Sequence, residues 1–331
     1  MQRSHDIPID IRQMEAFSAI MSAGSITAAA RLLGRSQPAI SRLIQDLEAR
    51  LGFSLLHRNG PRVSPTRQGL LFGEEAERFL ASFRHMQERA FSIGHNEPPP
   101  LSVDAIPALA AGLLPLTLAR LQQHMPMGQL SLHASSAEQV VQAVLGHRTD
   151  LGVTSLPVEH AGLDLHWIGE SGCVAVLSAD DPLARHETLS ISELGGQCLI
   201  TMSNPHRLRG RIDRTLAAAG VEPASLMVTN ASINAIMAAR AGLGIAIVEP
   251  ATAYTVPIAG VAIRTLDQRI PYFWGVFTAA GRPLSKPIEA LIDLLADVSV
   301  AALPYFRRHG PDELDSLRDD ILGPMDGGRD E

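Results

Sequence analysis

Apolar residues recur at helical spacing through the first part of the chain. From Ile11 to Met21 they stand three or four residues apart, which predicts an amphipathic helix. Ser25 can cap a second, short helix, because its hydroxyl oxygen can accept a hydrogen bond from the first turn. The run from Thr27 to Leu33 is rich in strong helix formers, and Gly34 ends it with room for a tight turn.

A third helix is expected to begin at Ser36, with Gln37 and Pro38 in its first turn. Proline is tolerated there because the N–H that it lacks would have no partner within the helix. The helix has one apolar stripe, which must be buried and consists of Ile40, Leu43, Ile44, Leu47 and Leu51. The opposite face is small, polar and cationic, and carries Gln37, Pro38, Ser41, Arg42, Gln45 and Ala49. Taken alone, this pattern favours a plain surface helix, but the order of short helix, glycine turn and capped helix is typical of a helix-turn-helix.

A hairpin is expected directly after this unit. Between residues 53 and 66, two short strand-like segments meet at Asn59-Gly60, a strong turn signal, and Arg58 and Arg62 flank the tip. A hairpin in this place forms a wing, whose arginines would lie along the DNA backbone or in a minor groove; ordinary exposed loop arginines are the alternative. The candidate DNA contacts are Thr27, Ser36, Gln37, Pro38, Ser41, Arg42, Gln45, Arg58 and Arg62.

Charge is distributed unevenly along the chain. The net charge of −7 over 331 residues argues against a nucleic-acid-binding protein, but residues 1–70 hold nine arginines against five acidic residues. A basic segment, residues 1–70, is thus followed by an acidic remainder of the chain, residues 71–331. Apolar residues make up 46% and charged residues 19%, as in globular proteins, and no run of 18 apolar residues predicts a membrane helix. The first residues lack the apolar core of a signal peptide, so we expect a cytoplasmic protein without a membrane partner.

Few residues suggest catalysis, a metal or a cofactor. Cys173 and Cys198 stand in apolar stretches without CxxC spacing, and the histidines form neither HxxxH nor HExxH. Gly242-Leu243-Gly244 precedes a strand-like run, whereas a dinucleotide motif follows one, so we interpret it as a turn. We predict no catalytic residue, no metal site and no cofactor, and an enzyme site assembled from distant residues stays open as an alternative.

Residues 10–69 resemble the DNA-binding domain of LysR-type transcriptional regulators. The matching segments include Gly24-Ser25-Ile26-Thr27-Ala28-Ala29-Ala30, Ser36-Gln37-Pro38-Ala39-Ile40-Ser41, Leu55-Leu56-His57-Arg58 and Pro65-Thr66-Arg67-Gln68-Gly69. A weaker similarity runs to about residue 306 and looks greatest to regulators of amino-acid and opine metabolism. The resemblance implies an α/β multidomain protein with three parts. These are a winged helix-turn-helix over residues 1–66, a long dimerising linker helix over 67–97, and a two-lobed effector domain, like that of periplasmic solute-binding proteins, over 98–306.

The linker helix also has support from its own residues. A heptad seam of alternating four- and three-residue steps is formed by Phe72, Ala76, Phe79, Phe83, Met86, Ala90 and Ile93. Such a seam predicts pairing with a second copy of the chain, and packing onto a domain is equally compatible. A two-fold dimer would place two recognition helices on pseudo-palindromic DNA. We therefore expect a homodimer or homotetramer on double-stranded DNA.

Beyond the prolines at residues 98–100, strand-like and helical segments alternate, which is an α/β order. The first lobe is expected over about 98–168 and 268–306, with one helix from Leu109 to His124. The second lobe is expected over about 169–267, with Cys173 to Ser178 as its first strand. Residues 307–331 are rich in acidic residues, Gly and Pro, and we expect an acidic, disordered tail.

The cleft between the lobes is the expected effector site. Ligands of such sheets bind where strand ends meet helix N-termini, because backbone N–H groups there attract anions. The candidate residues are Ile106, Pro107, Ser135, Ser136, Thr201, Met202, Ser203, Asn204, Asn230 and Ala231. Each segment is also an ordinary helix cap. Family regulators often have Ser or Thr at the position of Ile106-Pro107-Ala108, which puts one polar contact in doubt. Three arginines at 207, 209 and 211 either include a carboxylate anchor or form a solvated basic helix.

These observations favour a ligand-responsive, DNA-binding transcriptional regulator with a small effector that is amino-acid-like or another carboxylate. Two alternatives stay open. A solute-binding protein would fit the expected two-lobed domain. It would, however, carry an export signal and lack the basic segment at residues 1–70. An enzyme with an appended DNA-binding domain would turn its ligand over.

Overall fold

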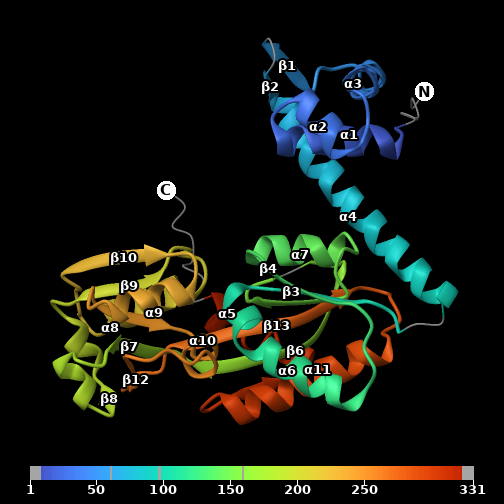
Figure 1. The fold of residues 1–331 in the computed structure, drawn as a ribbon. Coiled ribbons are helices and arrows are strands. Elements are labelled where there is room, and N and C mark those ends of the chain that lie inside the picture. Colours follow the sequence, from blue (N-terminus) through green and yellow to red (C-terminus); the bar gives the residue numbers. More distant parts are fainter. Residues whose placement is uncertain (1–8, 60–61, 96–97, 159, 323–331) are drawn as a thin grey trace, which may run out of the picture. The chain divides into compact units, whose positions relative to one another are not determined.

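The computed structural model describes residues 9–59, 62–95, 98–158 and 160–322, and the chain divides into two compact units, Met1–His95 and Asn96–Glu331 (Figure 1). The elements of the first unit are α1 (Ile11–Ala23), α2 (Ile26–Leu32), α3 (Gln37–Leu51), β1 (Leu56–Asn59), β2 (Arg62–Pro65) and α4 (Arg67–His95). This order is the expected winged helix-turn-helix followed by a long helix.

The start of each of the first three helices follows from a single capping residue. Asp10 caps α1 in a capping box with Gln13, and Ser25 caps α2 by accepting a hydrogen bond from the Ala28 N–H. Ser36 caps α3 in the same way, with Pro38 in the first turn. The apolar stripe of α3 is buried, since Ile40, Ile44 and Leu47 are fully covered and Leu43 and Leu51 pack beside them. The predicted third helix is therefore confirmed in its cap, its first turn and its buried face.

The wing is attached to the rest of its unit by a short series of contacts at its base. Strands β1 and β2 are antiparallel, with Leu56 opposite Pro65. The Glu48 carboxylate of α3 accepts hydrogen bonds from the N–H groups of Leu55 and Leu56, at 2.7 and 3.1 Å. On the other side, the Thr66 hydroxyl donates to the Ser54 carbonyl and accepts from the Gly69 N–H. A side chain at position 69 would meet the Leu55 carbonyl oxygen at 2.0 Å, so only glycine fits the first turn of α4.

Helix α4 is continuous, as expected, and its seam divides into two parts. Phe72 and Ala76 pack into the core of the winged helix-turn-helix, where the centres of the Phe72 and Phe17 rings are 5.6 Å apart. Farther along, Phe79, Met86 and Ile93 are exposed by 49%, 57% and 81%. The second part therefore presents an apolar stripe that its own unit leaves uncovered.

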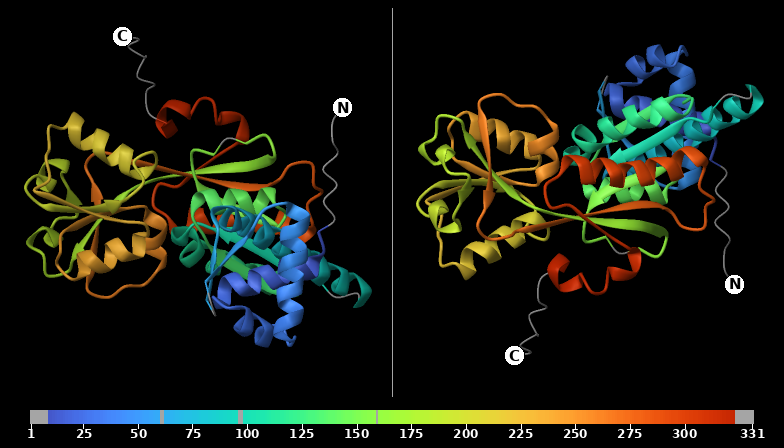
Figure 2. Two further views of the ribbon diagram at one scale, coloured as in Figure 1. Left: turned by 90° about the horizontal axis from the view of Figure 1, so that it is seen from above. Right: turned by 90° about the horizontal axis from the view of Figure 1, so that it is seen from below.

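The second unit consists of two α/β lobes (Figures 1 and 2). The elements of lobe I are β3 (Leu101–Ala105), α5 (Pro107–Ala111), α6 (Leu113–His124), β4 (Leu130–Ala134), α7 (Ala137–Leu145), β5 (Leu151–Ser155), β6 (Leu163–Gly172), β13 (Pro271–Ala279), α11 (Lys286–Ala302), β14 (Arg307–His309), a 3-10 turn (Pro311–Glu313) and α12 (Arg318–Leu322). Its sheet has the order β14-β6-β13-β5-β3-β4, with β4, β3 and β5 parallel.

Lobe II lies between the two halves of lobe I in the sequence. Its elements are β7 (Val174–Ser178), a 3-10 turn (Pro182–Arg185), β8 (Thr188–Leu189), a 3-10 turn (Ile191–Leu194), β9 (Cys198–Met202), α8 (Leu208–Ala218), β10 (Ser225–Thr229), α9 (Ser232–Arg240), β11 (Ile245–Val248), α10 (Pro250–Thr255) and β12 (Val261–Leu266). The sheet order is β10-β9-β11-β7-β12-β8, with β10, β9 and β11 parallel. The chain crosses between the lobes near residue 173 and again at residues 267–270.

The structure corrects one expectation about lobe I and adds one strand that was not expected. The single helix from Leu109 to His124 is wrong, because Gly112 breaks it into α5 and α6. The break brings the Gly112 backbone against α10, where an added side chain would meet the Thr255 hydroxyl at 2.5 Å. Strand β6, which the sequence did not predict, alternates polar and apolar residues and pairs with β13 on one side and β14 on the other.

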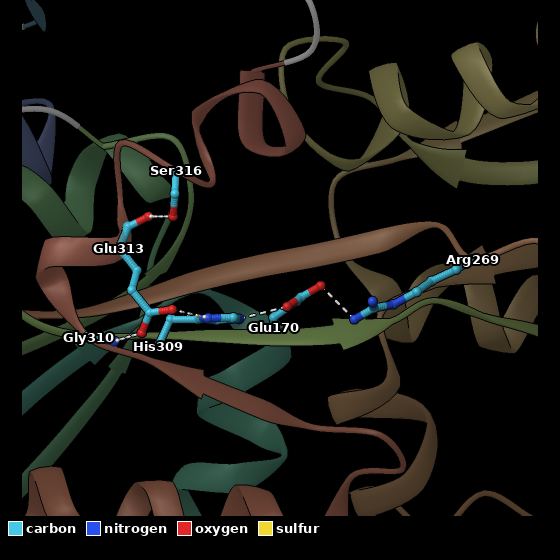
Figure 3. Close-up of polar contacts among 6 residues, drawn as sticks. All are labelled: Glu170, Arg269, His309, Gly310, Glu313 and Ser316. Carbon is cyan, nitrogen blue, oxygen red and sulfur yellow. Dashed lines mark hydrogen bonds and ion pairs between the residues drawn. The ribbon is translucent and has the colours of Figure 1, made fainter.

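The expectation of a disordered tail is wrong for residues 307–322, whereas residues 323–331 lie outside the described part of the chain. Strand β14 extends the lobe I sheet, and both ring nitrogens of its His309 lie at hydrogen-bond distance from carboxylates, Nε2 at 2.7 Å from Glu170 and Nδ1 at 3.1 Å from Glu313 (Figure 3). Helix α12 lies on the face of the sheet opposite α11 (Figure 2), with Ile321 4% exposed against Leu156, Ile168 and Phe273. Acidic composition concealed an apolar pattern, since Leu314, Leu317 and Ile321 stand at helical spacing.

Candidate effector cleft and DNA-binding surface

The polar face of α3 is free of contacts with the core of its unit. Ser36, Gln37, Pro38, Arg42 and Gln45 are exposed and Ser41 is half-buried. The Ser36 hydroxyl oxygen accepts from the Ala39 N–H at 3.4 Å, so its own proton remains available to a partner. Thr27, in the first turn of α2, is exposed as well. Amide, hydroxyl and guanidinium groups of this kind are those that reach base edges and phosphates.

The two wing arginines are placed by their backbones. Arg58 lies in β1 opposite Val63, and Arg62 lies in β2 opposite Asn59. The predicted turn at Asn59-Gly60 includes residue 60, which lies outside the described residues.

The effector cleft lies at the carboxyl ends of six strands, three from each lobe. It encloses about 260 Å³. Its wall is formed by Ile106, Pro107, Ala108, Ser136, Ala137, Glu138, Ser155, Met202, Ser203, Asn204, Arg207, Leu208, Thr229, Asn230, Ala231, Ser232, Glu249 and Tyr272. Strands β3, β4 and β5 end at this wall from lobe I, and β9, β10 and β11 from lobe II. This is the position where sheets of this type bind ligands.

Eight of the ten predicted cleft residues line this wall, namely Ile106, Pro107, Ser136, Met202, Ser203, Asn204, Asn230 and Ala231. The other two lie nearby in different surroundings. Ser135 donates its hydroxyl to the Asp104 carboxylate at 2.9 Å. Thr201 is fully buried, and its hydroxyl has no hydrogen-bond partner among the described residues.

The starts of helices α5, α7, α8 and α9 line the cleft. Helix α7 is capped by the Ser136 side chain. Helices α8 and α9, in contrast, begin without a side-chain hydrogen bond, and their first residues line the cleft. Unsatisfied N–H groups at such termini attract an anion. The start of α5 at Ile106-Pro107 offers no polar side chain, as the sequence indicated.

The three arginines of the α8 region have three different environments. Arg207 lines the cleft and donates to the Ser155 backbone carbonyl, to the Ser155 hydroxyl at 3.1 Å and to Glu138 at 3.3 Å. Arg209 donates from Nε to both carboxylate oxygens of Asp213, one turn later, at 2.7 and 2.8 Å. Arg211 is 3% exposed and donates to the carbonyls of Asp320 and Ile321 in the C-terminal segment. Of the three, only Arg207 is placed to meet a ligand.

Two carboxylates of the cleft were not among the predicted residues. Glu138 is at the rim, and its pKa is lowered by a hydrogen bond with its own backbone N–H at the start of α7 and by Arg207. Glu249 directly follows β11 and is 1% exposed, and burial raises its pKa to about 7. The rule that selected Thr201 to Asn204 and Asn230 would also have selected Glu249, because it follows the third parallel strand of lobe II.

The described residues include no helix that is long and apolar enough to span a membrane. They also include no group of three or more His, Cys, Asp or Glu side chains arranged to hold a metal ion.

Comparison with known proteins agrees with this architecture. Residues 95–299 match the LysR substrate binding domain, and residues 11–70 match the bacterial regulatory helix-turn-helix protein, lysR family. The chain is 29% identical over 297 residues to the regulatory protein NocR of Agrobacterium fabrum, which covers 90% of this chain and 99% of that protein. It is 33% identical over 245 residues to the octopine catabolism/uptake operon regulatory protein OccR of Rhizobium meliloti, which covers 74% and 81%.

The fold is also that of a solved LysR family structure. The crystal structure of CbnR, a LysR family transcriptional regulator, aligns with a TM-score of 0.75 at 22% identity, over 87% of this chain and 99% of that one. The helix-turn-helix, the two-lobed domain and the sequence matches lead to one conclusion: the chain belongs to the LysR family of bacterial transcriptional regulators, with a DNA-binding helix-turn-helix and an effector-binding domain.

Proposed function

We propose that the protein binds pseudo-palindromic promoter DNA as a homodimer or homotetramer in the cytoplasm, and that a small carboxylate effector in the interlobe cleft changes its action on transcription. The observation that carries the proposal is the capped start of α3, with an exposed polar face opposite a fully buried apolar stripe. Such a helix can enter a major groove while its other side holds it to the unit.

The proposed DNA contacts divide into two groups. Gln37, Ser41, Arg42 and Gln45 would face base edges and nearby phosphates, with Thr27, Ser36 and Pro38 at the helix starts. Arg58 and Arg62 of the wing would contact the backbone or a minor groove. Arginine suits both tasks, because its planar guanidinium donates two parallel hydrogen bonds.

The exposed part of α4 supports a dimer. Phe79, Met86 and Ile93 follow the heptad seam, and each is about half exposed or more. Apolar seams of this spacing are covered by a second helix in paired helices. A two-fold pair would present two α3 helices to two half-sites, and this doubling raises affinity and specificity for DNA.

The effector's carboxylate would lie at the uncapped starts of α8 and α9, next to Arg207. Backbone N–H groups and a guanidinium are the donors that a carboxylate prefers. NocR and OccR are by their names regulatory proteins, and OccR regulates octopine catabolism and uptake. Octopine is an amino-acid derivative with carboxylates, so these relatives favour an effector of that class for this chain as well.

The DNA-binding proposal is tested by a gel-shift titration of the full chain on the promoter region of its own gene at moderate salt. Arg42→Ala is expected to weaken binding about ten- to a hundredfold, since a base or phosphate contact is worth roughly 1–3 kcal/mol. The thermal midpoint should be unchanged, because Arg42 is exposed. Arg120→Ala, an exposed arginine of α6, is the matched control and should bind as the parent does. Equal affinity of the Arg42→Ala and Arg120→Ala variants would exclude α3 as the reading helix.

A second variant separates folding from recognition. Ile44 is fully buried in the apolar stripe of α3. Ile44→Ala is expected to lower the unfolding free energy of the winged helix-turn-helix by roughly 2–5 kcal/mol. Any loss of DNA binding should then follow the loss of folded protein, as measured by circular dichroism of the same samples.

The two alternative classes make different predictions. A solute-binding protein would show ligand affinity but no DNA shift. An enzyme would convert a bound ligand into a product, and we propose instead that the ligand is recovered unchanged. Chromatography of a ligand incubated with the protein distinguishes these outcomes.

A further inference from the structure

The cleft contains one buried carboxylate without a cation beside it. Glu249 is 1% exposed and lines the cleft. Its Oε2 accepts from the Thr252 N–H at 3.0 Å, and its Oε1 accepts from the Thr252 hydroxyl. Among the described residues, none of the arginines, the lysine or the histidines forms an ion pair with it. Each carboxylate oxygen therefore accepts one hydrogen bond from Thr252, but the described part of the chain supplies no counter-ion for the negative charge.

Capping a helix does not account for a glutamate at this position. Glu249 caps α10 through the Thr252 N–H. Ser, Thr, Asp and Asn are the preferred caps, and the two hydroxyl residues provide the same hydrogen bond without burying a charge. A buried carboxylate is costly unless it is paired. A structural cap alone therefore does not explain why an ionisable residue stands in the wall of the cleft.

The polar groups of the cleft are of two opposite kinds. Arg207 and the uncapped N–H groups of α8 and α9 provide positive charge and donors. Glu249 provides negative charge. Arg207, Glu249 and Tyr272 line the same cleft, and burial is the main cause of the raised pKa of the Tyr272 phenol. One ligand can therefore contact both kinds of group within a cleft of about 260 Å³.

We infer that the effector is a zwitterion, an amino acid or N-substituted amino acid, whose cationic nitrogen is bound by Glu249 while its carboxylate lies at Arg207 and the starts of α8 and α9. This inference rests on the proposed function, because it assigns the second end of the effector in the same cleft. Glu249 is then the specificity-determining residue that separates amino acids from simple carboxylates. An ammonium would supply the missing counter-ion, whereas a simple carboxylate would leave Glu249 unpaired.

The inference also predicts a pH dependence. Burial raises the pKa of Glu249 to about 7, and a bound cation requires the ionised form. The Thr252 hydroxyl donates to Glu249, and the other polar, titratable or charged groups in its surroundings are the Ser232 hydroxyl, the Cys173 thiol, the Tyr272 phenol and the Arg211 guanidinium. Burial raises the pKa of Cys173 and of Tyr272, and arginine stays charged, so none of these groups titrates between pH 6 and 8. The affinity for an amino acid should fall about tenfold from pH 8 to pH 6.

The first test uses the full-length parent protein and needs no variant. The twenty L-amino acids and the N-carboxyalkyl amino acids are screened by thermal shift. Each compound that stabilises the protein is then titrated calorimetrically beside its des-amino acid, which keeps the carboxylate and loses the nitrogen. We expect the amino compound to bind at least tenfold more tightly. Equal affinity of a pair, or no stabilisation by any amino compound, overturns the inference.

The second test assigns the preference to Glu249. Glu249→Gln keeps an oxygen for Thr252 and removes the charge. We expect it to lose at least tenfold in affinity for the amino compound, to bind the des-amino acid as the parent does, and to lose the dependence on pH. Glu289→Gln, an exposed glutamate in the first turn of α11, is the matched control and should keep the parent's preference. An unchanged preference in Glu249→Gln overturns the assignment.

Gel shifts of the same samples keep the two proposals apart. The parent protein without any amino compound gives the reference for DNA binding, and the Glu289→Gln control should match it. Intact DNA binding together with a failed amino-acid preference rejects this inference alone. Loss of DNA binding by the parent rejects the proposed function.

Discussion

Two ionisable side chains are buried where the lobes of the second unit meet, and the protein surrounds them differently. Arg211 of α8 is 3% exposed. Its guanidinium donates to the carbonyls of Asp320 and Ile321, at 3.3 and 3.0 Å, and lies 5.3 Å from the centre of the Phe273 ring. Glu249 is equally buried, but its described partners are neutral groups.

The two buried charges differ in whether the chain itself supplies groups of opposite charge or partial charge around them. Arg211 is provided with acceptors and an aromatic face by its own chain, including the C-terminal end of α12, where helix carbonyls carry partial negative charge. A charge that is fully provided for in this way is structural. Glu249 lines a cleft, and no cationic side chain among the described residues forms an ion pair with it. A charge in that situation indicates the chemistry of a ligand.

The largest expected effect comes from removing the partner of Arg211. A chain that ends after His309 loses α12, exposes the apolar face around Ile168, Phe273 and Phe277, and leaves the buried guanidinium without its two carbonyls. We expect the effector domain to lose on the order of 5 kcal/mol of unfolding free energy. Calorimetric melting of the full and shortened chains measures this loss.

A matched truncation is the control for that experiment. A chain that ends after Leu322 keeps every described contact of α12 and should melt as the full chain does. Equal melting of all three chains would show that the C-terminal segment adds nothing to the junction.

A smaller loss is expected from the guanidinium itself. Arg211→Met retains much of the side-chain volume but removes the hydrogen bonds to Asp320 and Ile321, whose carbonyls are left without donors. The expected cost is about 2–4 kcal/mol. Chemical denaturation monitored by tryptophan fluorescence measures it, because Trp167 and Trp274 are buried in the lobe I core. Arg214→Met, three residues along the same helix and exposed, serves as the control.

The smallest effect has the opposite sign and concerns Glu249. Its pKa is raised from about 4.5 to about 7, so between these values the folded state holds more protons than the unfolded state, and this residue lowers stability as pH rises. Glu249→Gln removes that penalty. Its stability advantage over the parent should grow by about 1 kcal/mol between pH 6 and pH 8, without ligand. Thermal melts at both pH values test this, and a variant that is less stable at pH 8 would contradict a buried, unpaired carboxylate.

The sequence predicted the features that depend on neighbouring residues. Ser36, Pro38 and the apolar stripe of α3 were correct because a cap and a helical period are local properties. The cleft segments at Met202 to Asn204 and at Asn230 were placed correctly because each follows a strand directly. Whether these residues contact an effector stays a prediction.

Features that depend on distant contacts were missed or misinterpreted. The break at Gly112 exists because α10, more than a hundred residues later, packs against it. Helix α12 is ordered because Ile321 fills an apolar site formed by β6 and β13, which composition alone does not reveal. The seam of α4 left pairing with a second copy and packing onto a domain open, and only the distant contacts of Phe72 and Ala76 show that its first part belongs to the core of its own unit.

The close contact at Gly69 has a mechanical consequence. The first turn of α4 rests directly on the Leu55 backbone, and Thr66 and Glu48 fix the same base of the wing from both sides. No compliant side chain separates the helix from the hairpin. A rotation of α4 about its own axis must therefore carry the base of the wing with it, so that the helix and the wing turn together as one rigid body.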